Sequence, residues 1–243
     1  MRIRTGILEI DRLEDESGRP SPPLVKSIDD VPTDAEAVQI SAKTRGLADL
    51  AARPRLRRVV ARAFGDAELE HVGRIATLER LELAGPTSRD LRALRGLSQL
   101  RILNVSVAAR LESLDGIEKL TQLQVVGIWR TPKLRSIDAL AALHELRIVF
   151  LAGGMYRPMR IPSLQPLSGL DRLVKLSLSS VRVTDHSLRP LLTLNALRRL
   201  DLPLHFPLEE FAMLEQALPD ATGQWRDLWR GWGGVRARRP SAS

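Results

Sequence analysis

The segment LSQLRILNVSVAARLESLDGIEKL, residues 97–120, decides the fold. Apolar residues fall at Leu100, Leu103 and Val105, in the order apolar, two variable, apolar, one variable, apolar, and the last positions alternate as in a short β-strand. Further apolar residues then recur at every third position, at Leu111, Leu114, Ile117 and Leu120. That spacing suits a short helical or 3-10 turn. The segment therefore predicts one strand followed by one turn of helix.

The same pattern recurs in seven clear copies along the chain. The copies are Leu56/Val59/Ala61, Leu78/Leu81/Leu83, Leu100/Leu103/Val105, Leu123/Val126/Ile128, Leu146/Val149/Leu151, Leu173/Leu176/Leu178 and Leu197/Leu200/Leu202. Their starts advance by 22, 22, 23, 23, 27 and 24 residues, and a weaker copy at Ala35/Val38/Ile40 lies 21 residues before the first. One such unit cannot bury its own apolar face, so neighbouring units must stack and the two ends need caps. The sequence predicts an α/β fold: a right-handed solenoid with a parallel concave sheet and short helical or 3-10 turns on its convex side.

This spacing resembles the leucine-rich repeat family, and its 22-residue register resembles the internalin-type and phosphatase-regulator-type class of that family. The resemblance covers residues 35–220 and implies a scaffold that binds partner macromolecules on its concave face. The family usually places asparagine three residues after the last strand leucine, but here those positions hold Phe64, Pro86, Ala108, Thr131, Gly154, Val181 and His205. Without asparagine to bond the neighbouring backbone, the turns must satisfy their backbone groups by other means, and we expect some local irregularity and no regular curvature.

Both ends of the chain carry segments outside the repeat. Residues 1–34 predict a strand or hairpin around Ile3, Ile7 and Ile10, followed by an irregular linker from Ser17 to Thr33. After the last repeat, residues 208–218 predict an amphipathic capping helix. Its apolar residues fall at helical spacing, at Leu208, Phe211, Leu214 and Leu218.

The C-terminal tail, residues 221–243, is rich in tryptophan and arginine. Trp225, Trp229 and Trp232 share one helical face, which favours packing against the open end of the solenoid. The arginines that flank them leave insertion into a membrane surface as the alternative. We expect disorder beyond about residue 235.

Composition narrows the classes of function. The chain has 243 residues, of which 44% are hydrophobic, so it can bury a full core, and it has no cysteine for a disulfide, a thiolate zinc site or a nucleophile. Its first residues lack the apolar run of a secretory signal or membrane span, which predicts a cytoplasmic location. The four histidines lie in different repeats, and there is no glycine-rich phosphate loop followed by lysine. We therefore expect no enzyme activity, catalytic residue, metal, cofactor or small-molecule substrate.

The strand alternation predicts which side chains form the concave face. Five apolar residues on three neighbouring strands are expected to be exposed side by side there: Ile102, Val125, Trp129, Ile148 and Phe150. Gly127 is expected to leave room for Phe150 to lie flat. Four cations are expected at the rim of this patch: Arg62, Arg80, Lys175 and Arg199. Apolar anchors inside a charged rim are typical of a protein-binding hot spot. The alternative is that Trp129 folds onto its own repeat and the cluster only packs side by side.

The repeat after Phe150 is longer than its neighbours, and its surplus runs from Gly153 to Pro162. It carries Tyr156, the only tyrosine, together with two methionines and two arginines, a mixture suited to contact with a partner. The alternative is a neutral insertion.

The formal charge of +8 and the pI near 10.8 favour an anionic partner as a second hypothesis. Of the 37 basic residues 32 are arginine, which a GC-rich genome would also produce. The leading prediction is a non-enzymatic module, monomeric alone, that binds a partner protein, as a regulatory or inhibitory subunit would. The alternative is an anion binder for nucleic acid or an acidic membrane surface through the arginine-rich surface and tail.

Overall fold

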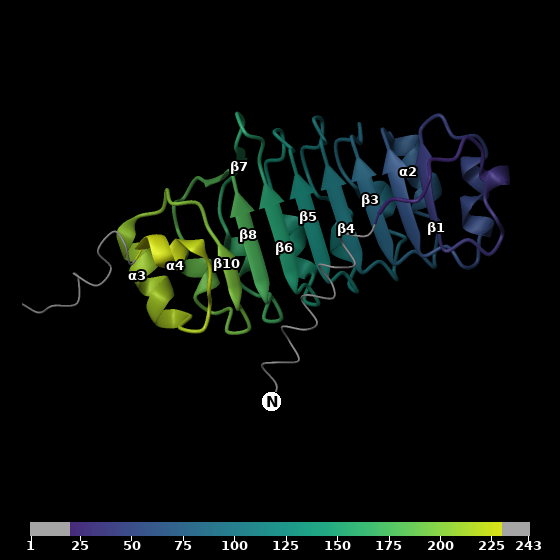
Figure 1. The fold of residues 1–243 in the computed structure, drawn as a ribbon. Coiled ribbons are helices and arrows are strands. Elements are labelled where there is room, and N and C mark those ends of the chain that lie inside the picture. Colours follow the sequence, from purple (N-terminus) through teal and green to yellow (C-terminus); the bar gives the residue numbers. More distant parts are fainter. Residues whose placement is uncertain (1–19, 230–243) are drawn as a thin grey trace, which may run out of the picture.

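The computed structural model describes residues 20–229. Its central feature is an eight-stranded parallel sheet (Figure 1). Its strands follow one another in chain order: β1 (Ala37–Ser41), β2 (Arg58–Arg62), β3 (Arg80–Ala84), β4 (Ile102–Ser106), β5 (Val125–Trp129), β6 (Ile148–Ala152), β8 (Lys175–Ser179) and β10 (Arg199–Asp201). All seven predicted strands are present, and the weaker copy forms β1. Each strand pairs with the next without a slip, as in Leu81↔Leu103 and Leu103↔Val126. The predicted parallel sheet is therefore confirmed.

Short helices cover one face of the sheet (Figure 1). They are η2 (Leu47–Ala52), α2 (Asp66–Val72), η3 (Arg92–Leu94), η4 (Ile117–Lys119), η5 (Asp138–Ala142), η6 (Gln165–Leu167) and η7 (Arg189–Leu191). The side chains that alternate inward from the strands, such as Leu103 and Val126, pack against these helices and are fully buried. The predicted helical and 3-10 turns are confirmed, and one apolar core lies between the two layers.

The turns that leave four of the strands share one backbone conformation. The residue after each strand has a positive φ: Ala63 (57°), Gly85 (66°), Val107 (55°) and Arg130 (52°). The amide of each of these residues donates to the last carbonyl of the next strand at 2.8–2.9 Å, as Ala63 does to Ala84. The backbone is thus satisfied without an asparagine. These four turns are regular, with the apolar Phe64 and Ala108 in the core, and the expected local irregularity is found in the longer repeat after β6.

The longest repeat is built differently. After β6 the chain forms β7 (Met159–Ile161), which pairs in parallel with β9 (Val181–Val183) from the following repeat in a separate two-stranded sheet. Four of its residues are buried, namely Met159, Ile161, Val181 and Val183. This sheet was not predicted from the sequence, although apolar residues two apart were its signal.

The N-terminal segment covers the first repeat. The Val25 amide donates to the Gln39 carbonyl at 3.0 Å, and Ile28 in η1 (Ile28–Asp30) is fully buried. The segment from Pro20 to Thr33 is irregular apart from η1 and isolated bridges, as predicted, but it packs as a cap. The strand or hairpin predicted around Ile3, Ile7 and Ile10 lies outside the described residues.

Two helices close the other end, α3 (Leu208–Ala217) and α4 (Gln224–Trp229). The first corresponds to the predicted capping helix, although Leu208 is 54% exposed because it begins the helix on the side away from the core. Phe211 stacks on Trp225 and Trp229, whose ring centroids lie 6.1 and 6.5 Å away. Both tryptophans are buried, so they pack on the solenoid end and are not available to a membrane surface. Trp232 and the predicted disorder beyond 235 lie outside the described residues.

Candidate partner-binding face

The face of the eight-stranded sheet opposite the short helices is called the open face below. The first, third and fifth residues of each strand point to it, because side chains alternate along a strand. The register places Ile102, Val125 and Ile148 in one row across three neighbouring strands. Phe150 on β6 pairs in register with Gly127 on β5, the neighbouring strand that also carries Trp129. The predicted adjacency of these residues is therefore confirmed.

Exposure of the first row was the wrong prediction. Ile102, Val125 and Ile148 are 4, 1 and 0% exposed, and they form a second apolar cluster with Phe150 and Val174. Neighbouring strands lie only about 4.8 Å apart, so branched side chains in register fill the space beside one another. The apolar surface available to a partner is consequently smaller than predicted.

Trp129 and Phe150 are the partly exposed members of the predicted patch. Their rings stack with centroids 6.3 Å apart and planes 23° from parallel. The Trp129 ring lies over Gly127, where an added Cβ would clash with it. Gly127 thus makes room for Trp129 and not, as predicted, for Phe150. The alternative in which Trp129 folds onto its own repeat is confirmed, yet the ring keeps an exposed part.

The four predicted rim cations differ in environment. Arg62 and Arg199 are exposed, whereas Arg80 is only 6% exposed. The Nε atoms of Arg80 and Arg58 both donate to Glu82 Oε1, each at 3.0 Å. A shared carboxylate therefore draws Arg80 into a paired cluster, and its assignment to an exposed rim was wrong. The ion-pair cluster that Arg58 and Glu82 form with Arg80 was not predicted from the sequence, although both residues point to the open face.

Lys175 also has a defined contact on the open face. Its Nζ atom lies 4.9 Å from the centroid of the Phe150 ring, a cation–π geometry. The contact fixes one side of the aromatic pair and brings a positive charge next to it. The row of apolar and aromatic residues is therefore bounded by a cation at this strand.

Tyr156 lies in the loop between β6 and β7. It is 90% exposed, and its neighbour Met155 is 85% exposed. The loop base is held by the Gly154 amide, which donates to the Arg157 carbonyl at 2.9 Å, and by the Ser180 hydroxyl, which donates to the Gly154 carbonyl at 2.8 Å. The loop thus presents a large apolar ring on a closed turn beside the ends of β6 and β8.

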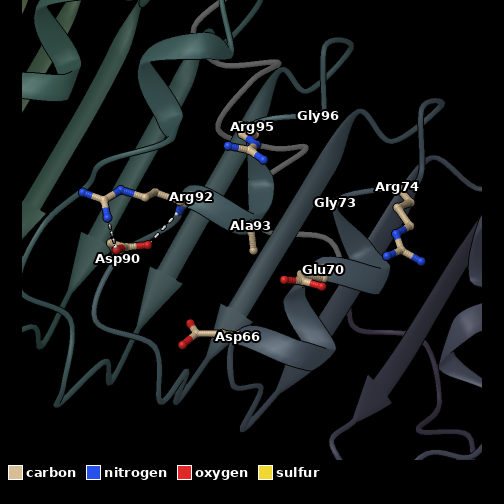
Figure 2. A pocket seen from close by; sticks show the side chains of 9 residues that line it. All are labelled: Asp66, Glu70, Gly73, Arg74, Asp90, Arg92, Ala93, Arg95 and Gly96. Atoms are coloured by element: carbon tan, nitrogen blue, oxygen red, sulfur yellow. Dashed lines mark hydrogen bonds and ion pairs between the residues drawn. The ribbon is translucent and has the colours of Figure 1, made fainter.

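A groove on the helical side lies between α2 and η3 (Figure 2). The carboxylates of Asp66 and Glu70 point into it from α2, and Asp90 pairs with Arg92 at 3.4 Å. An added Cβ at Gly73 would overlap the Ala93 carbonyl, so the two segments approach as closely as their backbones allow. Within residues 20–229, no three His, Cys, Asp or Glu side chains gather as metal ligands do. The groove is explained by the packing of two repeats.

Among the described residues, Asp115 and His205 have shifted pKa values. The Ser113 hydroxyl and then Arg92 lower the pKa of Asp115, partly opposed by desolvation. Burial lowers the pKa of His205, and the charges of His186 and Arg182 add to this effect. A neutral His205 ring can accept the Val183 amide, which lies 3.4 Å from its Nε2. Both groups serve local structure, and neither faces Trp129 or Phe150.

Comparisons with known proteins address the fold. No protein-family model matches the sequence, and no curated protein matches it either. Internalin C2 from Listeria monocytogenes superposes with a TM-score of 0.55 at 18% identity, over 75% of this chain and 78% of that one. The mouse RP105/MD-1 complex gives 0.51 at 16% identity, over 79% and 39%. A plant peptide hormone receptor, RGFR1 with RGF2, gives 0.50 at 12% identity, over 84% and 38%. The chain therefore has the leucine-rich repeat fold, as its spacing predicts.

No helix within residues 20–229 is long and apolar enough to cross a membrane.

Proposed function

We propose that the chain is a protein-interaction module that binds a partner protein on its open face, with Trp129 and Phe150 as the anchors. The observation that carries the proposal is the stacked, partly exposed aromatic pair on an otherwise ordered sheet. Partly exposed aromatic residues are enriched at the centres of protein interfaces.

The aromatic pair is held in place before any partner arrives. The row of Val125 and Ile148 supports Phe150 from one side, and Gly127 receives the Trp129 ring. Lys175 contacts the Phe150 ring from the other side. Side chains that are already fixed lose little rotamer entropy on binding, so more of the contact energy remains as affinity.

Proteins of the same fold support this reading by analogy. The mouse RP105 structure contains MD-1, and the plant receptor structure contains RGF2. A fold by itself does not specify a partner. The analogy supports protein binding as a class, whereas the choice of Trp129 and Phe150 is argued from this chain alone.

The test removes the anchors and keeps the fold. Trp129→Ala and Phe150→Ala should each weaken binding by about 2 kcal/mol or more, measured by calorimetry against a partner identified by affinity capture with the wild-type chain. Leu208→Ala is the matched control, because Leu208 is an exposed apolar residue on α3 and far along the chain. Circular dichroism checks the fold of each variant.

Two results would contradict the proposal. One is a captured partner whose affinity is unchanged by both aromatic variants. The other is a Trp129→Ala chain that unfolds, while Phe150→Ala folds and binds as the wild type does. The first result would show that the aromatic pair does not anchor the partner, and the second that Trp129 belongs to the core.

A further inference from the structure

A row of cations lies at the edge of the solenoid where the strands end. Arg110, Lys133, Arg160 and Arg182 come from four consecutive repeats, and each directly precedes a buried apolar residue. These four residues are called the basic rim below. The following residues form the equivalent inward column, namely Leu111, Leu134, Ile161 and Val183. Four consecutive repeats therefore carry a cation at the equivalent position, and these cations form the basic rim.

The pairing of β7 with β9 fixes the geometry at one end of the basic rim. Arg160 stands directly opposite Arg182 in the register, and both are exposed while their strand neighbours are buried. The two backbones are therefore about 4.8 Å apart. Like charges directly opposite one another destabilise a sheet, so this arrangement opposes folding.

Within residues 20–229, the basic rim has no acidic partner. None of its four side chains forms a hydrogen bond or ion pair there, and the nearest acids in sequence, Glu112 and Asp185, form no ion pair with it. Other arginines of the chain do find carboxylates, as Arg92 does with Asp115 at 2.9 Å. The basic rim is thus set apart from the paired charges elsewhere on the surface.

The exposed Tyr156 belongs to the same edge. It precedes Arg160 by four residues on a closed turn, and Arg157 lies beside it in that turn, also exposed. An aromatic ring at 90% exposure has a free face for stacking. A line of cations and an open aromatic ring beside it are the two elements of a single-stranded nucleic acid site.

We propose that the basic rim binds the phosphate backbone of single-stranded nucleic acid, and that Tyr156 stacks on one base. Arginine offers planar paired donors that match phosphate oxygens, and three of the four cations are arginine. An acidic protein segment would use the same charges. We commit to nucleic acid because a line of cations beside a single exposed ring offers both the phosphate contacts and the stacking platform of such a site. This proposal uses neither of the proposed anchors, Trp129 and Phe150, and does not rest on the proposed function.

The test measures binding of a fluorescent 20-nucleotide oligo(dT) to the full chain as salt is varied. On a single strand, each neutralised phosphate contributes a slope of about −0.7 in log affinity against log salt. Replacing Arg160 and Arg182 by glutamine should therefore make the slope about 1.4 less steep. Tyr156→Ala should weaken binding by about 5- to 150-fold with the slope unchanged.

The matched control is Arg74→Gln with Arg95→Gln, which removes the same charge from the helical-side groove. It should leave the slope within error of the wild type. The proposal is overturned if oligo(dT) does not bind, or if the control pair reduces the slope as much as the rim pair does. It is also overturned if poly-L-glutamate binds as tightly and Tyr156→Ala has no effect, because the rim then fits an acidic protein segment.

Discussion

Two rows of side chains on the same three strands point in opposite directions, and both are buried. Leu103, Val126 and Val149 face the short helices and belong to the core that runs the length of the solenoid. The second row, Ile102, Val125 and Ile148, lies on the open face and packs only within a small cluster. Strand alternation thus dictates the direction of a side chain, whereas its exposure depends on what stands beside it in register. Phe150 gains its fixed position from this second row.

The largest effect is expected in the helix-facing row. Leu103→Ala removes a fully buried side chain between two layers that cannot close the gap, and should lower the free energy of unfolding by about 2–5 kcal/mol. Urea denaturation followed by circular dichroism measures the loss. A loss below about 1 kcal/mol would mean that this row is not the main core.

The open-face row should show a smaller loss. Ile148→Ala also removes a fully buried side chain, but Phe150 and Val174 at the margin of its cluster are only partly buried and can move into the space. We expect about 2 kcal/mol, the low end of the range for such a truncation. The same denaturation experiment, run beside Leu103→Ala, checks it. Equal losses would show that the two rows are energetically one core.

The smallest effect concerns the support of the aromatic pair. Gly127→Ala places a Cβ against the Trp129 ring and should cost about 1–2 kcal/mol as the ring is displaced. In a Trp129→Ala background the same substitution should cost less, because the obstructing ring is gone. A double-mutant cycle in urea gives this coupling. A coupling of zero would show that the ring does not rest on Gly127.

Much of the fold could be predicted from the sequence, because the apolar spacing that indicates a strand and a turn recurs in every repeat. The seven strands, the parallel sheet and the capping segment at 208–218 follow from spacing alone. The pair β7–β9 was missed, since a strand such as Met159–Ile161 shows only one cycle of alternation. Ordered turns were also missed, because a left-handed residue such as Val107 carries no sequence signal.

The candidate site was predicted less well than the fold. The positions of Trp129 and Phe150 on one face followed from the alternation. The burial of Arg80 did not, because it depends on a carboxylate, Glu82, that two arginines share. The rotamer of Trp129 depends likewise on the missing side chain at Gly127. Such properties arise from pairs of residues and from their distances, which a pattern of single positions does not contain.

The one-repeat register has a consequence for how this chain can change in length. Each strand of the main sheet pairs with the strand of the next repeat, so the chain between two partners is only one repeat long. Examples are Arg80 with Ile102 and Ile148 with Lys175. Loop closure depends on the logarithm of loop length, so the extra residues before β8 cost about 0.2 kcal/mol in chain entropy. The turn around Tyr156 can therefore be lengthened, by evolution or by grafting a foreign peptide. The neighbouring strands would still pair as before.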